Sequence, residues 1–396
     1  MTGLNKAWHL FRDEVKYLLG GRVPLAAILI GLPLAFTLLF GMVYHDNVVN
    51  TISMVVHDEY QSSMSRQLIQ MYADSERYEI VSYVDSQEAF EKAVQKDEAI
   101  VGLGIPRDFS KNIKKGSSTD FLLMVNSANN MFGNAALSSA QEINRSYSVA
   151  VGKKLIEGLG VLPSASMNAV YPVHFGVRIL NNPTNGYTQF MLAGLMLNGL
   201  QIGLMLIVPP LLIREIRERC NGKDTSSLAI LLGSVAAVWC AAVGAFVVSM
   251  LVIVYGFDVP LRGSWLQTVI LGGAFAFFVV GALLVFSACA PNEVLSMQAP
   301  MLYIMPGLLY SGLSWPQFAM TNLAAFLGAI LPITYAGDTL RDIMLAGSAP
   351  SFWGDIVHML LGGIIAAALS LGIFSVRRHW KFKGGVRRES LADCPK

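Results

Sequence analysis

The chain has 396 residues and a formal net charge of only +2, so no overall field indicates a nucleic acid partner. Hydrophobic residues make up 54% of the sequence and charged residues 14%, and the mean hydropathy of +0.50 is too high for an ordinary soluble protein. This composition predicts an α-helical polytopic membrane protein.

Residues 1–22 form a charged leader in which apolar side chains recur at helical spacing. The members of this apolar face are Leu4, Ala7, Trp8, Phe11, Val15, Leu18 and Leu19. Such a pattern predicts a cytoplasmic amphipathic helix that lies at the membrane interface. A simple flank before a membrane anchor is the alternative interpretation.

Long runs with few charges follow the leader, and each approaches or exceeds the length of about 20 residues that a helix needs to cross a bilayer. We expect six spans, at residues 23–44, 187–213, 228–255, 265–290, 294–312 and 353–376. Basic residues cluster before the first run, after the second and in the tail at 377–396. Positive-inside logic therefore places both termini in the cytoplasm.

The region before the last span is the least regular. Residues 294–312 are apolar but contain Pro300 and Pro306, and residues 318–334 are apolar but short. Counting both as spans would put the basic tail outside, against the positive-inside rule. We therefore take 294–312 as the fifth span and expect a re-entrant segment at 315–345, covered by protein.

Residues 45–186 have ordinary polar composition and predict an inserted extracytoplasmic domain. Strands are expected at 51–57, 78–84, 99–105 and 121–125, and helices at 61–71, 86–96 and 135–159. Strands that alternate with helices indicate a small α/β domain. The four cysteines lie outside this insert, so they imply no disulfide framework.

Motifs that would supply energy or a nucleophile are incomplete. Gly222 and Lys223 resemble the end of a phosphate loop, but Arg217 and Asp224 occupy positions where that loop needs glycine and a hydroxyl residue. The histidines show no metal-ligand spacing. We expect no cofactor on this chain, no catalytic or metal site, and no enzyme activity of its own.

Four stretches carry a family resemblance: SMVVHDEYQSSMSRQLIQ, DSQEAFEKAVQKDEAIVGLGIPRDFSKNIKKG, REIRER and LPITYAGDTLRDIMLAG. With the order of leader, span, large insert and further spans, they resemble the membrane subunit of type-2 ABC exporters, in the bacterial drug or lipid group with an enlarged outer domain. The resemblance implies a bacterial inner-membrane location and two permease subunits, identical or sister chains. It also implies separate P-loop ATPase subunits that bind ATP and Mg, and membrane lipid as a further partner. A periplasmic adaptor is left open.

The second run offers a face for a transport pathway. Tyr187, Met191, Gly194, Asn198, Gln201 and Met205 follow steps of three and four, so they share one side of a helix. Amides in hydrocarbon need a partner or water, which favours a cavity or a helix contact. In the fifth run we select Met297, Gln298, Met301 and Tyr303, since flexible thioethers suit varied apolar ligands. Ordinary helix packing is the alternative for the methionines.

For coupling to the ATPase we select the charged cluster after the second run, namely Arg214, Glu215, Arg217, Glu218 and Arg219, together with Glu293. Ordinary flanking charge is the alternative. The family resemblance implies a Gly-Thr-rich helix start after the cluster, but Cys220 to Asp224 depart from it, which leaves the contacting side chain open. Asp338, Arg341 and Asp342 fit one helical turn as a structural ion-pair group.

These observations predict a dimeric permease that moves a hydrophobic or amphipathic, drug-like or lipid-like molecule outward, powered by ATP hydrolysed on partner subunits. A membrane-anchored receptor or assembly scaffold that acts through its outer domain is the alternative. A secondary transporter is less favoured, because no inverted repeat or buried coupling carboxylate is apparent.

Overall fold

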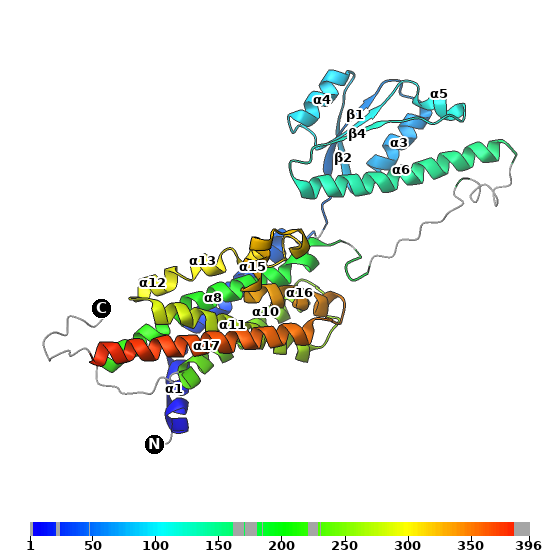
Figure 1. Ribbon diagram of the computed structural model, residues 1–396. Coiled ribbons are helices and arrows are strands. Elements are labelled where there is room, and N and C mark those ends of the chain that lie inside the picture. Colours follow the sequence, from blue (N-terminus) through cyan, green and yellow to red (C-terminus); the bar gives the residue numbers. More distant parts are fainter. Residues whose placement is uncertain are drawn as a thin grey trace. The chain divides into compact units, whose positions relative to one another are not determined.

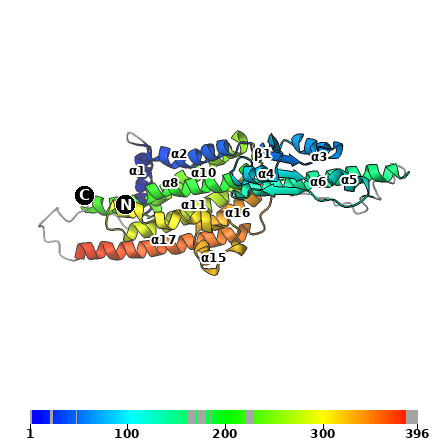
Figure 2. The same ribbon diagram turned by 90° about the horizontal axis from the view of Figure 1, so that it is seen from above.

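The computed structural model describes residues 3–20, 24–46, 48–160, 170, 180–183, 185–220, 229 and 231–383. The chain divides into two compact units (Figures 1 and 2). The helical unit comprises Met1–Asn47 and Ile179–Lys396, and the α/β unit comprises Val48–Arg178. The α/β unit falls within the insert expected at 45–186.

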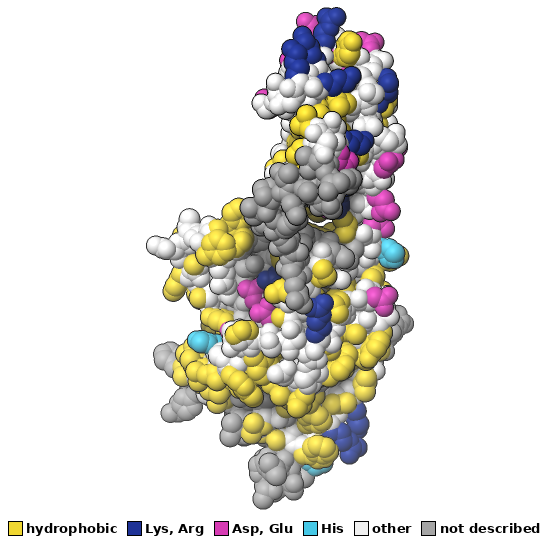
Figure 3. All heavy atoms as spheres, turned by 90° about the vertical axis from the view of Figure 1, so that its right-hand side faces the viewer, with side chains coloured by type: hydrophobic (Ala, Val, Ile, Leu, Met, Phe, Trp, Pro, Cys, Tyr) yellow, Lys and Arg dark blue, Asp and Glu magenta, His cyan; other side chains and the backbone are white. Residues whose placement is uncertain are grey.

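The helical unit contains five helices that are long and apolar enough to cross a membrane, counted over the described residues. They lie in α2 (Leu25–Val43), α8 (Tyr187–Cys220), η1 and α10 (Leu231–Val235 and Ala236–Gly256), α11 (Trp265–Cys289) and α17 (Phe352–Lys383). Each coincides with one of the predicted charge-poor runs. Hydrophobic side chains cover much of this unit on the face that Figure 3 shows. The prediction of a mostly helical, multi-pass membrane protein is confirmed.

The segment expected as the fifth span is not one membrane-length helix. It consists of α12 (Glu293–Gln298), α13 (Met301–Ile304) and α14 (Gly307–Tyr310), interrupted at Pro300 and Pro306. Proline has no backbone N–H to donate and its ring collides with the preceding turn, so a regular helix stops there. The breaks therefore fall at the two prolines noted in the sequence, and the assignment of 294–312 as the fifth span stays a prediction.

The expected re-entrant segment contains two short helices after the 3-10 turn η2 (Gln317–Ala319). These are α15 (Asn322–Ala329) and α16 (Pro332–Leu345), which meet at an angle of 84°. Pro332 starts α16, where a missing N–H costs nothing. Thr334 closes the corner by donating its hydroxyl to the Gly328 carbonyl at 2.7 Å. The pair could form one broken span or a re-entrant loop, so re-entry stays a prediction.

Glycines allow α11 and α17 to pack closely, side by side in Figures 1 and 2. A Cβ at Gly281 would lie 2.8 Å from the carbonyl oxygen of Gly363, and one at Gly363 would lie 2.5 Å from the ring of Phe277. Small residues at such contacts let two helix backbones approach and gain dispersion contacts. The close approach therefore depends on the missing side chains.

Replacing Gly281 with alanine is expected to destabilise the helical unit by about 2 kcal/mol, because the new methyl group meets backbone that cannot rotate away. The matched control is Gly372→Ala on α17, where an added Cβ meets nothing within 4 Å. Unfolding of the purified chain in detergent measures both variants. Equal midpoints for the two would contradict this account of the packing.

The α/β unit is built on a four-stranded sheet in the order β2-β1-β3-β4. Its strands are β1 (Ile52–Asp58), β2 (Tyr78–Tyr83), β3 (Val101–Ile105) and β4 (Leu122–Val125). β1 pairs in parallel with both β2 and β3, while β4 is antiparallel to β3. All four strands were predicted from the sequence, within one to two residues at each end.

Helices cover both faces of this sheet. One core joins alternate residues of β1 with α3 (Ser63–Ala73), α5 (Phe109–Lys114) and α6 (Asn130–Gly158). A smaller core on the other face joins Val55 with Phe90 and Val94 of α4 (Gln87–Gln95). Ser86 caps α4 by accepting from the Ala89 N–H, at the start of the helix predicted over 86–96. Helix α5 was not predicted.

Tyr147 of α6 is buried, and its hydroxyl donates to the Met64 carbonyl at 2.9 Å. Burial raises the pKa of Tyr147 from 10.0 to about 12. Because the folded pKa exceeds the unfolded one, this group stabilises the domain below pH 10, and the contribution is lost as the pH rises through 12. The difference in tyrosinate absorbance between wild type and Tyr147→Phe, titrated at alkaline pH, is expected to show one tyrosine ionising near pH 12. Ionisation of this tyrosine near pH 10 would contradict the account of its burial.

Candidate functional site

The predicted pathway face of α8 is largely buried inside the helical unit. Met191 and Met205 are buried, and Gln201 is only 2% exposed. The Gln201 amide donates to the Asn198 side-chain oxygen at 2.8 Å, as their spacing of three residues allows. The two predicted amides therefore satisfy each other in an apolar setting, and Asn198 keeps partial exposure.

This face of α8 lies against the proline-interrupted segment. A Cβ at Gly307 of α14 would lie 3.3 Å from the Gln201 amide nitrogen, and a Cβ at Gly194 would lie 2.8 Å from Leu313. Helices α12 and α13 also contact α8. The structure thus brings together the two stretches from which the sequence analysis selected pathway residues.

The side chains selected in the proline-interrupted segment do not share one environment. Met297 is partly buried, whereas Gln298 and Met301 are exposed. Tyr303 turns back into the unit, where its hydroxyl donates to the Ile330 carbonyl at 2.9 Å and its ring packs on Phe286. Tyr303 therefore holds the segment against the end of α15, whereas the Met301 side chain is exposed and does not share this environment.

Exposed apolar side chains form a face on this segment, which we call the α12–α14 face. Leu302 is the most exposed, at 86%. The apolar members of the face are Val294, Leu295, Met301, Leu302, Met305 and Leu309, and the exposed amide of Gln298 belongs to the same segment. An apolar face of this length needs lipid or protein against it.

One end of α8 carries aromatic and charged contacts. Tyr187 packs edge-on against Tyr44 with ring centroids 4.7 Å apart. Arg341 of α16 lies over the Phe190 ring at 4.7 Å and forms an ion pair with Asp338. The prediction of an ion pair within this turn of α16 is confirmed for Asp338. The Thr339 hydroxyl donates a hydrogen bond to the Asp355 carboxylate of α17 in the same region, a contact that no sequence pattern indicated.

The other end of α8 carries Arg214, which was selected for ATPase coupling. Its guanidinium forms an ion pair with Glu14 of α1 (Gly3–Leu19) and lies 4.0 Å from the centre of the Tyr17 ring. Glu14 is only 4% exposed. Arg214 therefore ties the leader helix to the end of α8.

Of the other residues selected for ATPase coupling, the structure describes the side chain of Glu293 only. The side chains of Glu215, Arg217, Glu218 and Arg219 lie outside the described residues. Glu293 is the first residue of α12, where a carboxylate complements the helix N-terminus, and it is partly exposed. Its coupling role stays a prediction.

The leader is the helix α1, but its buried face differs from the expected one. Ala7, Glu14 and Leu18 are buried, while Trp8 and Leu19, two members of the predicted apolar face, are each 64% exposed. A Cβ at Gly233 of η1 would lie 2.7 Å from Leu10, so α1 packs closely against η1. The buried side of α1 thus includes Glu14, which pairs with Arg214, and the interfacial position of the leader at the membrane stays a prediction.

These features define a multi-pass membrane protein whose polar and adaptable side chains gather along one central helix. The family model described as "ABC-2 family transporter protein" matches residues 25–371. The chain belongs to this family.

Curated relatives agree with the assignment. The chain is 22% identical over 369 residues to the probable multidrug ABC transporter permease YbhR of Escherichia coli, and the match covers 90% of this chain and 95% of that protein. It is also 35% identical over 100 residues to ABC transporter G family member 20 of Dictyostelium discoideum, where it spans 25% of this chain and 14% of that protein. The chain is thus an ABC transporter permease, a transport subunit that works with ATPase subunits.

Proposed function

We propose that this permease forms, with a second copy or a sister permease, the transmembrane pathway of an exporter for hydrophobic or amphipathic molecules of drug-like or lipid-like character. The Asn198–Gln201 pair beside the α12–α14 face carries the proposal. It combines one hydrogen-bonding point with a flexible apolar surface, which suits amphipathic cargo. The E. coli relative is itself described as a probable multidrug permease.

A second permease subunit would cover part of the α12–α14 face. Its side chains are exposed and mostly apolar, and the helices that carry them contact α8, which carries the amide pair. Cysteines placed at Met305 and, as a control, at the exposed Leu361 of α17 test this in a background without native cysteines. We expect a disulfide dimer from Met305→Cys in membranes; a dimer from Leu361→Cys alone would contradict the placement.

We further propose that the α/β unit is extracytoplasmic and that both termini face the cytoplasm of a bacterium, with the protein in its inner membrane. The charge distribution of the sequence supports this orientation. Cytoplasmic termini place α1 and the end of α8 where separate ATPase subunits, which carry ATP and Mg, can reach them.

Reconstitution tests the function. The chain is purified together with its copurifying P-loop ATPase and placed in inside-out vesicles with a fluorescent lipophilic dye. We expect ATP-dependent dye accumulation and faster ATP turnover in the complex than in the ATPase alone. Dye movement without the ATPase would contradict the proposal, and unchanged turnover without transport would favour the receptor or scaffold alternative.

A further inference from the structure

The sheet of the α/β unit reverses its strand order at one place. The chain passes from β1 to β2 on one side and then returns to β3 on the other side of β1, with all three strands parallel. Loops diverge at such a switch point and leave a crevice beyond the carboxyl ends of the strands. Here a cavity of about 320 Å³ lies at the ends of β1 and β3.

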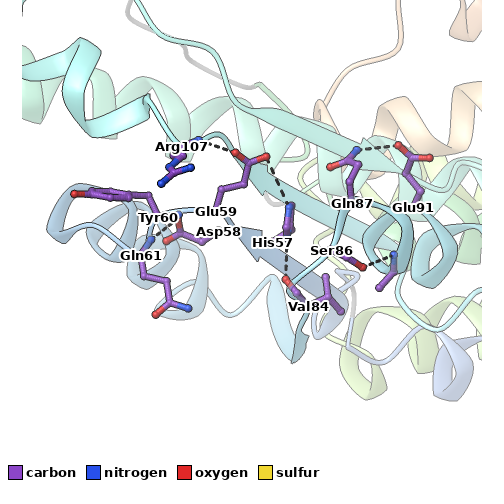
Figure 4. Close-up of polar contacts among 11 residues, drawn as sticks. His57, Asp58, Glu59, Tyr60, Gln61, Val84, Ser86, Gln87, Glu91 and Arg107 are labelled. Atoms are coloured by element: carbon purple, nitrogen blue, oxygen red, sulfur yellow. Dashed lines mark hydrogen bonds and ion pairs between the residues drawn. The ribbon is translucent and has the colours of Figure 1, made fainter.

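His57, near the end of β1, lines this cavity together with Glu59, and its Nε2 lies on the side of the Glu59 carboxylate. The residue is 5% exposed, and its Nδ1 lies 2.8 Å from the Val84 carbonyl oxygen (Figure 4). A carbonyl can only accept, so Nδ1 carries the proton and Nε2 is an acceptor in the neutral ring. The described partner nearest to Nε2 is Glu59 Oε1 at 3.9 Å, which is too long for a hydrogen bond.

Glu59 is held in place by the end of β3. Its Oε2 accepts from the Arg107 backbone N–H at 3.0 Å, which leaves Oε1 on the side of His57 (Figure 4). When the His57 ring is neutral, Nε2 and Glu59 Oε1 are therefore two acceptors that face each other 3.9 Å apart. An ammonium group donates in several directions and can serve both.

The rest of the lining has one sign of charge. Asp120 supplies a second carboxylate, Phe121 and Leu122 supply an apolar wall, and the described lining residues include no lysine or arginine. A concave site with a single charge sign concentrates ions of the opposite sign, and an aromatic ring adds attraction for a cation. Within the described residues, no group of three or more metal-ligating side chains is present, which favours an organic cation.

We propose that the cavity between the ends of β1 and β3 binds a small organic ammonium ion with an apolar substituent. Glu59 and His57 accept hydrogen bonds from the ammonium, Asp120 adds charge, and Phe121 and Leu122 contact the substituent. The proposal concerns the α/β unit alone, so it does not depend on the transport function.

Binding of benzylammonium to the full-length chain in detergent tests the proposal, with benzyl alcohol as the neutral probe of the same shape. We expect benzylammonium to bind about tenfold more tightly than benzyl alcohol, a difference that one charge-assisted hydrogen bond can supply. Glu59→Gln combined with Asp120→Asn is expected to remove that preference. The glutamine keeps an oxygen for the Arg107 N–H, so the strand ends stay joined.

Glu79→Gln provides the matched control, because Glu79 is an exposed carboxylate of β2 outside the cavity lining. It is expected to leave both affinities unchanged. Should the double variant unfold, Asp120→Asn alone, at an exposed loop position, is expected to weaken benzylammonium binding about threefold. Equal affinity for the two probes, or full benzylammonium binding by a folded double or single variant, would overturn the proposal.

Discussion

Replacing Arg214 with glutamine is expected to detach the leader helix from α8 and to lower the free energy of unfolding by about 3 kcal/mol, since it removes the cation that is paired with the buried Glu14 carboxylate. Removing one partner of a buried pair costs more than removing both, because the remaining charge keeps its desolvation penalty. The Glu14→Gln and Arg214→Gln double variant should therefore be more stable than Arg214→Gln alone. If Arg214 also has the proposed role of transmitting the conformational change of the ATPase subunits, the Arg214→Gln variant also loses ATP-driven export.

A double-mutant cycle in detergent measures this coupling, with SDS or heat as the denaturant. The control is Arg12→Gln, which removes an exposed arginine from the same helix and should change stability by less than about 0.5 kcal/mol. If the single and double variants differ from wild type by amounts that simply add, the ion pair does not hold α1 in place.

Replacing both Asn198 and Gln201 with leucine is expected to reduce export about tenfold while leaving the fold intact. The two amides bond to each other, so removing both leaves no unpaired polar group, and stability should change little. If cargo binds as proposed above, it loses a hydrogen-bonding partner on α8, and a lost hydrogen bond of this kind corresponds to about a factor of ten in binding. Cargo-stimulated ATP turnover measures the effect.

The same helix offers a control for this experiment. Gln189→Leu replaces a partly exposed amide of α8 that lies outside the predicted pathway face, and it should leave export unchanged. Normal export by the Asn198→Leu and Gln201→Leu double variant, at normal expression, would assign the pair to helix packing only.

Much of the fold could be read from local patterns. Charge-poor runs identified the five long helices, and the alternation of strand-like and helix-like runs in the insert identified the strands and α4. The Asn198–Gln201 bond also follows from spacing, because residues three apart on a helix are neighbours. These features depend on residues close together in the sequence.

The features that the sequence did not reveal depend on long-range contacts. The buried ion pair of Glu14 is one of them, because its partner, Arg214, lies 200 residues away. The one local signal was its position between Phe11 and Leu18 on an apolar side of the leader. The sequence did not reveal the cavity by His57 either, because its residues come together only where β1 pairs with β3.

The interruptions between α12 and α14 have a mechanical consequence. Pro300 and Pro306 donate no backbone hydrogen bond, so the carbonyls of Ser296 and Leu302 lack the donors that a regular helix would supply. Because the helical hydrogen bonds are already interrupted at Pro300 and Pro306, the segment can bend at these two positions without breaking a backbone hydrogen bond. A displacement of one end of this segment would then bend α12 to α14 where they pack beside Gln201 of α8, and the bend would cost little energy.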